Sequence, residues 1–565
     1  MKKLLLILLI LILGCRHSPS KSFKSLKEPF LNWYFKYHPI EGYLYNQEIY
    51  IDNLLTNQES REEYYADLSR FFIELTQINE TKLFIDDHID YNTIYKEIEK
   101  RRYIHKNIKN WEWDPLATIK TIYDVLLLLY DLDEMQMELR IGKIEELLFL
   151  VPKILNSSKN QLTKYSVIHQ NYANKFIDGI RLIIKDIPLK IEADHNTMDK
   201  IDKYISKNIE LLNNYQIWIN SEYNKMEPIN FPEDLNLIKS GFKYLVDEKY
   251  SSQNVYYLAD KKIIPIQNKM FNLALPIYLE KNDEPVWLDR DDTLDVIKWT
   301  LKTIENKRYV FDDYLSHIAS SIETIDNFIK LKNLFNTELN ETIILNHSPP
   351  YLVYPDLAYL FGSSNKGISN QIIYYIKDSL YNESASKYNV NKFQMDLINA
   401  EKIIPGLNTQ NSFSKNYSSM IRYVFPNQIN QLGWSSYASE IILDKGFGSW
   451  NPLYHLVKLK RELTMVSATI AEKQYYNGSK DKEQIRNFYI EQAFLHDWEI
   501  NILQYYTDID YFYNTRKFIG YTEIKNLKKR YENKMSEKFS LLDFHQLILE
   551  TGPIPIYELK KILLD

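Results

Sequence analysis

Residues 451–470 read NPLYHLVKLKRELTMVSATI, and this stretch shows which kind of fold to expect. Asn451 can cap a helix, and Pro452 suits the first helical position because its fixed φ angle already matches the helix. Apolar side chains then recur every three or four residues, which places them on one face. They are Leu456, Leu459, Leu463, Val466 and Ile470. The stretch therefore predicts an amphipathic helix that Gly478 brings to an end.

The sequence after Gly478 predicts a second helix. Asp481 followed by Gln484 has the spacing of a capping box, in which each side chain bonds the backbone N–H of the other residue. The apolar positions of this helix are Ile485, Phe488, Leu495 and Ile502. Only 14 glycines and 19 prolines interrupt the 565 residues, so long helices can form, while stretches 257–266 and 372–377 look like strands. We expect a mainly α fold, a large multi-helix body with a few short strands.

The N-terminus has the parts of an export signal. Lys2 and Lys3 form a short basic region, residues 4–13 are an unbroken apolar run, and Gly14 closes the run before Cys15. This run is too short to span a bilayer, which needs about 20 apolar residues. Directly after Cys15 the chain becomes polar. We therefore expect residues 1–14 to be a cleaved signal peptide and not a membrane-spanning anchor.

Cys15 is the only cysteine of the chain, so it cannot form an internal disulfide. Its place at the end of the signal indicates a lipidation site, as in bacterial lipoproteins that carry palmitate or similar acyl chains. The alternative is a plain secretory signal followed by a coincidental cysteine. One acyl chain binds a membrane only reversibly, whereas two or three make the anchor durable. We expect residues 15–27 to hold the lipidated cysteine and a flexible tether from His17 to Ser25, ahead of a helical domain over 28–565 of one or two lobes.

Composition limits the partners. Removing Lys2 and Lys3 from the 69 basic residues, against 75 acidic ones, leaves a mature net charge of −8. This mild charge suggests neither nucleic acid nor acidic lipid as a partner. No stretch after the signal is long and apolar enough to enter a membrane. The lipid on Cys15 is then the link to the cell envelope, on the periplasmic or the surface face of a bacterial membrane.

A search for catalytic motifs finds few candidates. None of the 11 histidines lies three to five residues from another, so the chain has no His-Glu-x-x-His zinc motif. It also has no pair of cysteines, no Gly-x-Ser-x-Gly elbow and no glycine-rich phosphate loop. His496, followed by Asp497, and His545 are the most tempting histidines, but each lies in an apolar helical setting. We expect them to pack or cap helices.

Several short motifs together carry a family resemblance. In the C-terminal half they are Gly433-Trp434-Ser435-Ser436-Tyr437-Ala438, Ile519-Gly520, Phe544-His545-Gln546, Leu549 and Gly552-Pro553-Ile554-Pro555. Near the N-terminus they are His38-Pro39 to Gly42 and Trp111-Glu112-Trp113-Asp114-Pro115. In their order and spacing the chain resembles the bacterial domain-of-unknown-function 885 (DUF885) family over nearly the whole mature length. The resemblance implies a helical fold similar to gluzincin-type zinc peptidases, with a cleft motif His-Glu-x-x-Pro-Gly-His-His-x-Gln and a later Glu-Gly-Trp.

The chain departs from this pattern where the family would bind zinc. Aligned on Pro405-Gly406 and Gln410, the motif places other residue types at its functional positions. Glu401 stands at the first ligand histidine, Lys402 at the general-base glutamate, Leu407 at the second histidine, Asn408 at the histidine after it, and Leu432 at the glutamate before Gly-Trp. A later family glutamate falls on Ser439, one step from Glu440, and a third stretch led by Arg461 maps Asp and His onto Ala468 and Glu472.

These replacements predict the loss of the metal. Catalytic zinc needs three protein ligands and an open position for water, and one carboxylate with a leucine cannot supply them. Lys402 also adds a positive charge beside the expected metal position. We therefore expect no cofactor, and a pseudoenzyme whose degenerate cleft (Glu401, Lys402, Leu407, Asn408, Gln410, Leu432 and Glu440) binds a peptide or protein. The alternative is a zinc-dependent, carboxypeptidase-like metallopeptidase with other ligands, such as His455, His496 or His545.

Overall fold

The computed structural model describes residues 18–46, 49–54, 57–131, 135–282, 290–305, 314–336, 341–362, 371–377 and 390–564. The expected signal peptide and Cys15 lie outside these ranges. Helices dominate the described residues and the strands are few and short, so the prediction of a mainly α fold is confirmed.

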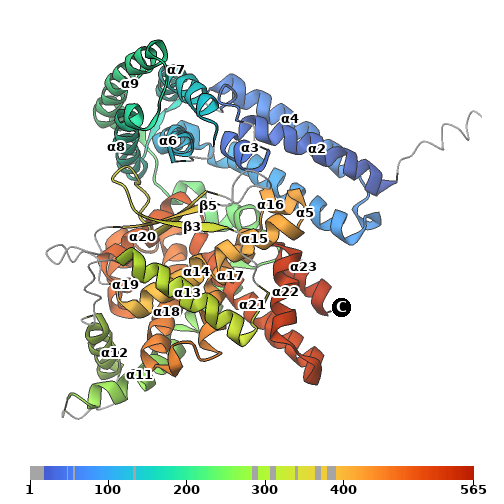
Figure 1. Cartoon of the computed structure of the whole chain (residues 1–565), viewed down its shortest axis with the longest axis vertical. Coiled ribbons are helices and arrows are strands. Elements are labelled where there is room, and N and C mark those ends of the chain that lie inside the picture. The colour runs from blue at the N-terminus through green and yellow to red at the C-terminus, as the bar shows by residue number, and fades with distance from the viewer. Residues whose placement is uncertain are drawn as a thin grey trace, which may run out of the picture.

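The N-terminal helices form the first of three hydrophobic clusters. They are α2 (Pro19–Tyr37), α3 (Pro39–Asn46), α4 (Gln58–Thr76) and α5 (Ile85–Tyr103). The short helix α16 (Met420–Val424), far away in sequence, contributes Ile421 and Val424 to the same cluster. Figure 1 shows α16 against α5, between the blue N-terminal helices and the C-terminal half.

Residues 19–25 of the expected flexible tether from His17 to Ser25 are instead the start of α2. The Ser18 side chain caps this helix by accepting a hydrogen bond from the backbone N–H of Lys21, and Pro19 occupies the first turn. Phe23, Leu26 and Phe30 recur at helical spacing and are buried. Burial of this apolar face explains why the segment is helical and not a free linker.

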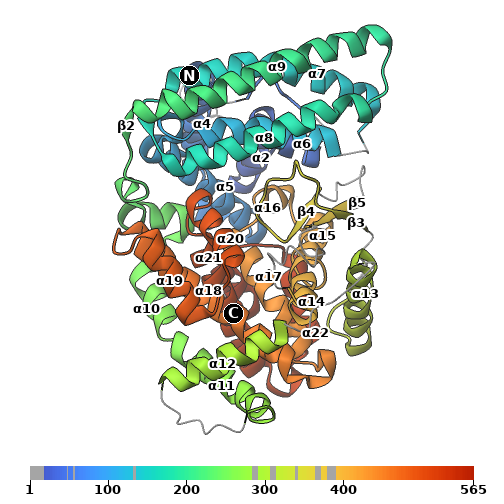
Figure 2. The ribbon, with the colours of Figure 1, turned by 90° about the vertical axis from the view of Figure 1, so that its left-hand side faces the viewer.

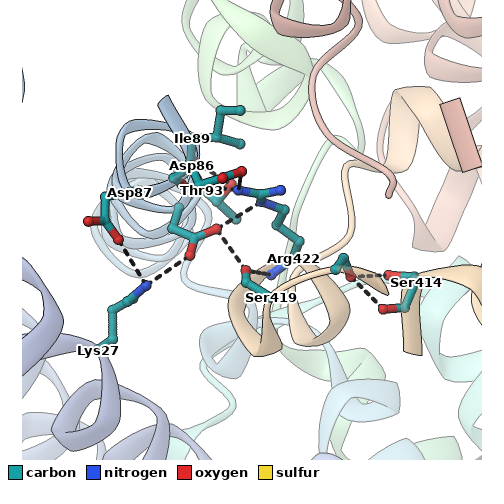
Figure 3. Close-up of polar contacts among 10 residues, drawn as sticks. Lys27, Asp86, Asp87, Ile89, Thr93, Ser414, Ser419 and Arg422 are labelled. Atoms are coloured by element: carbon teal, nitrogen blue, oxygen red, sulfur yellow. Dashed lines mark hydrogen bonds and ion pairs between the residues drawn. The ribbon is translucent and has the colours of Figure 1, made fainter. Parts of the chain in front are cut away.

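Ion pairs fasten the N-terminal helices to α16. Lys27 of α2 lies 3.3 Å from the Asp87 carboxylate and 3.1 Å from that of Asp90. Arg422 of α16 donates to Asp90 at 2.9 Å through Nε and to Asp86 at 2.8 Å. Figure 3 shows Lys27 and Arg422 converging on these carboxylates of α5. Because Asp90 is almost fully buried, both cations are needed to offset its desolvation.

A second cluster lies within α6 (Pro115–Asp131), α7 (Met137–Gln161), α8 (Val167–Lys190) and α9 (His195–Ser221). Figure 1 places these helices at the top of the molecule. A small sheet lies below them. Its strands are β3 (Thr342–His347), β4 (Ala358–Phe361) and β5 (Gln371–Ile376), in the order β3-β5-β4, with β3 parallel and β4 antiparallel to β5. The strand expected at 372–377 is therefore present as β5. Two further strands, β1 (Lys164–Tyr165) and β2 (Glu227–Pro228), form one short parallel pair.

The third and largest cluster belongs mainly to the C-terminal half. Its helices are α10 (Ser252–Asp260), α11 (Ile263–Leu279), α12 (Arg290–Glu305), α13 (Tyr314–Lys332), α14 (Lys392–Lys402), α15 (Leu407–Tyr417), α17 (Gln428–Leu443), α18 (Pro452–Tyr476), α19 (Lys482–Ala493), α20 (Asp497–Ile509), α21 (Tyr513–Met535), α22 (Leu541–Thr551) and α23 (Ile556–Leu564). Helix α18 is the one predicted from 451–470: the Asn451 side chain caps it and Leu463 is fully buried.

Two expectations for this half are wrong. The stretch 257–266 is not a strand but the end of α10 and the start of α11, because the buried residues of these helices, such as Val255, Ala259 and Ile266, follow helical spacing. The helix expected from Ile485 to Ile502 is two helices. Phe494 ends α19 with a left-handed φ of 58°, and α20 begins afresh after it. The capping box of Asp481 and Gln484 is present at the start of α19.

Candidate functional site

A pocket of about 210 Å³ lies where five C-terminal helices meet beside the sheet. Its wall comes from α14, α17, α18, α20 and α21, and from the residues that lead into β4. Figure 2 shows these helices around the centre of the lower half. Of the residues mapped onto the expected cleft, Glu401 and Lys402 at the end of α14 and Leu432 of α17 line this pocket.

Helix α17 holds the end of α14 in place. The Trp434 indole N–H donates to the Pro405 carbonyl oxygen at 2.8 Å, and the Ser435 hydroxyl donates to the Glu401 carbonyl oxygen at 2.8 Å. Trp434 is fully buried. The Gly-Trp-Ser motif therefore packs, as expected for a bulky aromatic residue, and it also fixes the turn that carries Glu401 and Lys402.

Two glycines let α17 and α21 approach closely. A Cβ atom on Gly433 would lie 2.3 Å from the carbonyl carbon of Gly520, and one on Gly520 would lie 1.9 Å from the Ile429 carbonyl oxygen. Any larger residue at either position would push the helices apart. This crossing brings Lys517 and Tyr521 of α21 to the same pocket as Leu432.

The Glu401 carboxylate is held by Arg461 of α18. Arg461 Nε donates to Glu401 Oε1 at 2.8 Å, and Nη2 donates to Oε2, so both carboxylate oxygens are engaged in a two-pronged pair. Burial by itself would raise the pKa of Glu401. The Arg461 guanidinium, helped by Lys517 and Lys402, outweighs burial and lowers this pKa below its usual value.

Lys402, next to Glu401 in the chain, makes a longer ion pair than Glu401 does. Its Nζ lies 3.7 Å from the Asp356 carboxylate, just before β4. Asp356 also accepts a hydrogen bond of 2.7 Å from the Tyr506 hydroxyl of α20. Glu401 and Asp356 are thus both satisfied by groups of the protein.

A second ionic group centres on Glu440, directly behind the pocket wall. The carboxylate lies 3.1 Å from Lys458 and 3.0 Å from Lys525, and it accepts a hydrogen bond from the Tyr521 hydroxyl. Burial would raise the pKa of Glu440, but the two lysines overcome it and lower the pKa to about 2. Lys458 also lies 3.6 Å from Glu462. Glu440 is therefore an ionised structural carboxylate at neutral pH.

Besides Glu440, three other residues of the expected cleft do not line this pocket. Leu407, Asn408 and Gln410 lie on α15, and Gln410 Nε2 donates to Asn430 Oδ1 at 2.9 Å in the interior. The part of the motif on α14 therefore lies at the pocket, whereas the part on α15 lies outside it. Sequence reasoning also missed Lys517, Asp356 and Tyr506, because no local pattern marks them.

The side chains at this place do not form a zinc donor set. Both Glu401 oxygens bond Arg461, Leu432 is apolar, and Leu407 lies outside the pocket. Glu472 accepts hydrogen bonds from the Thr515 backbone and side chain at 3.0 and 2.6 Å. Within the described ranges, no three histidine, aspartate or glutamate side chains come close enough together to share a metal ion.

The three histidines considered as alternative zinc ligands, His455, His496 and His545, do not line this pocket. His545 is fully buried, and its ring nitrogens contact the Leu334 carbonyl oxygen at 2.9 Å and the Tyr437 hydroxyl at 3.2 Å. Burial lowers the pKa of His545 to about 3, which keeps the ring neutral. His496 caps α20 and contacts Glu305 at 2.7 Å, while His455 stacks against Trp450. The packing and capping roles expected of His545 and His496 fit these contacts.

The fold and the pocket define a large helical protein with an ionic cleft between α14, α17, α18, α20 and α21. The chain belongs to the family described as "Bacterial protein of unknown function (DUF885)", which matches residues 51–563. No curated protein matches this chain. In the described ranges, no helix has both the length and the hydropathy that a membrane crossing requires.

Two solved structures share this fold. One is a candidate lipoprotein of unknown function from Shewanella oneidensis, with 18% identity, a TM-score of 0.80, and 97% of this chain and 100% of that chain covered. The other is a candidate lipoprotein from Colwellia psychrerythraea, with 14% identity, a TM-score of 0.79, and coverage of 97% and 99%. At these identities the likeness shows the fold alone.

Proposed function

We propose that this chain is a lipid-anchored protein of the bacterial cell envelope that binds a peptide or a protein segment in its ionic cleft without hydrolysing it. The observation that carries the proposal is the pair between Glu401 and Arg461. Both oxygens of the carboxylate that the motif alignment places at an expected zinc ligand already bond a guanidinium.

Hydrolysis of a peptide needs a polarised carbonyl and an activated nucleophile. The expected position of the general base holds Lys402, whose ammonium group faces the Asp356 carboxylate. A lysine acts as a base only where its pKa is strongly lowered. The pocket nevertheless keeps features of a binding site, since apolar side chains from α17, α18 and α20 stand beside its charged groups.

The lipid anchor rests on the sequence of the N-terminus. A short apolar signal ends at Gly14, and Cys15 follows as the sole thiol of the chain. The described part of the chain begins three residues later, so the folded body would lie close to the lipid.

Zinc content and peptide cleavage test the proposal together. The full chain, extracted in detergent, is incubated with excess zinc, desalted and analysed for metal, and a mixed peptide library is incubated with it in the presence and absence of a chelator. We expect much less than one zinc per chain and no cleavage that the chelator prevents. Glu401→Gln is the matched variant, because it removes the charge that a metal would need.

One zinc per chain, lost in Glu401→Gln and accompanied by chelator-sensitive cleavage, would contradict the proposal. That result would assign the chain to the active metallopeptidases instead.

A further inference from the structure

The charges that line the pocket do not balance. Each of its four carboxylates has a cation of the same pocket as its partner. The pairs are Asp356 with Lys402 at 3.7 Å, Glu401 with Arg461, Glu462 with Lys458 at 3.6 Å, and Glu499 with Lys460 at 3.0 Å. Glu440, behind the wall, adds one carboxylate but also brings in Lys525 at 3.0 Å. One lining cation, Lys517, is left over.

Lys517 of α21 lines the same pocket as these paired charges. Within the part of the chain that the structure describes, its ammonium makes neither an ion pair nor a hydrogen bond. Burial is the main reason why the pKa of Lys517 lies below its usual value. Glu401 and, to a smaller extent, Asp356 raise this pKa, whereas Arg461 and Lys402 lower it. A partly buried cation without a partner is unfavourable, and an anion from outside would relieve this cost.

The size and the apolar part of the pocket limit what that anion is. The cavity of about 210 Å³ is small beside the 300 Å³ or more of a typical drug-sized site. Its apolar lining includes Ile398, Leu432, Val457, Met465, Ile502 and Leu503. One surplus positive charge matches a monoanion, and the apolar wall matches a hydrocarbon side chain on the same ligand.

We propose that the pocket binds the C-terminal carboxylate of a peptide that ends in an apolar residue, with Lys517 as the group that receives the carboxylate. Lys402, only loosely paired with Asp356, is the second donor within the same group. The inference rests on the proposed peptide-binding function and adds to it the part of the peptide that is recognised.

The test compares two probes that differ only at the carboxylate. Acetyl-Ala-Ala-Leu as the free acid and as the C-terminal amide are titrated into the full chain in detergent by calorimetry. A hydrogen bond between two charged groups is stronger than one between neutral groups, so we expect the acid to bind at least about tenfold more tightly than the amide. In Lys517→Met this difference should disappear. In Lys529→Met, an exposed lysine on the same helix, it should remain.

A second measurement needs no variant. Trace acetic anhydride acetylates free amines, and mass spectrometry reports the labelled fraction at each lysine. A saturating concentration of the free-acid peptide should slow the labelling of Lys517 about tenfold. The amide peptide at the same concentration should leave the labelling rate nearly unchanged.

The outcomes separate this inference from the function on which it rests. Three outcomes would overturn the inference and leave peptide binding intact: equal binding of acid and amide, a preference for the acid that survives in Lys517→Met, or labelling of Lys517 in the natural chain that the acid does not slow. Binding of neither probe, together with no binding of a longer peptide library, would overturn both. Binding of the free amino acid leucine as tightly as the acid would show that a small carboxylic acid, and not a peptide end, is recognised.

Discussion

Arg461 shows how a single side chain decides what a carboxylate can do. Glu401 alone could attract a cation from solution, but the guanidinium of α18 engages both of its oxygens. Arginine is well suited to this, because its planar fork matches a carboxylate and stays charged at any accessible pH. The negative charge of Glu401 is thus balanced by a group of the protein itself.

Glu472 is a residue whose charge should depend on pH. It is buried beside Thr515, and burial raises its pKa to about 7 despite the hydrogen bonds that it accepts. The folded state therefore binds a proton more tightly than the unfolded state. The contribution of this group to stability is fully present below pH 4.5, falls as the pH rises to about 7, and stays constant above.

Glu472→Gln removes this titration. As the pH rises from 5 to 8, the free energy of unfolding of the variant should increase relative to that of the natural chain, by an amount on the order of 3 kcal/mol at most. Urea unfolding curves at both pH values measure the difference. Because all other titrating groups are shared, they cancel in the comparison. Parallel changes of the two proteins with pH would show that Glu472 is ionised throughout.

For single residues, the sequence predicts which ones lie at the pocket only where a local motif marks them. Glu401, Lys402 and Leu432 could be placed at the pocket because a motif aligns locally on Pro405-Gly406 and on Gly-Trp. Lys517 and Asp356 could not, since they reach the pocket from α21 and from the approach to β4, far away along the chain. Nothing in the neighbouring sequence of either residue marks a ligand.

Helices α17 and α21 depend on their shared glycine contact. Gly520→Ala would place a methyl group 1.9 Å from the Ile429 carbonyl oxygen, which is backbone and cannot rotate away. We expect a loss of stability at or above the upper end of about 1 to 3 kcal/mol, measured by urea unfolding. Peptide binding should weaken too, because Lys517 is carried by the helix that moves.

Gly142→Ala is the control for this prediction. Gly142 lies in α7, and a Cβ atom there meets nothing within 4 Å. Alanine is a better helix former than glycine by about 1 kcal/mol, so this variant should be as stable as the natural chain or slightly more stable. Equal effects of the two substitutions would mean that the close approach of α17 and α21 is not what Gly520 serves.

Elements with several agreeing signals could be predicted from the sequence, and those with one signal could not. Helix α18 has a cap, a proline in its first turn and a regular apolar face, and it has the expected extent. The segment 257–266 offered a single signal for a strand, its tyrosine and isoleucines, and tertiary packing overrode this preference. The break between α19 and α20 was missed because Phe494 adopts a left-handed conformation that is rare outside glycine and asparagine.

At the scale of the molecule, three hydrophobic clusters are joined by polar contacts. The network of Lys27, Asp90 and Arg422 connects the first helices to the C-terminal half, although more than 300 residues separate Asp90 from Arg422. The N-terminal helices are thus part of the folded body that contains the pocket.

Membrane attachment can be tested on the whole chain. Cys15→Ala should leave the precursor uncleaved or move the protein from the membrane fraction to the soluble fraction, because the acyl chains supply the binding energy. Cell fractionation followed by mass spectrometry of the N-terminal peptide measures both effects. Cys15→Ala protein that is processed normally and still needs detergent for release would contradict the lipid anchor.

The early start of α2 has a consequence for how such a molecule meets its partners. Three residues lie between Cys15 and Pro19, and the four backbone steps that join the two residues reach about 14 Å at most when fully extended. If Cys15 carries lipid, the body can neither tumble freely nor drift away from the bilayer. Ligands held on the same membrane would then meet it at an effective concentration in the millimolar range. Such confinement would let a pocket of modest affinity stay occupied by peptides held on the same membrane, whereas the same peptides at low concentration in solution would leave it mostly empty.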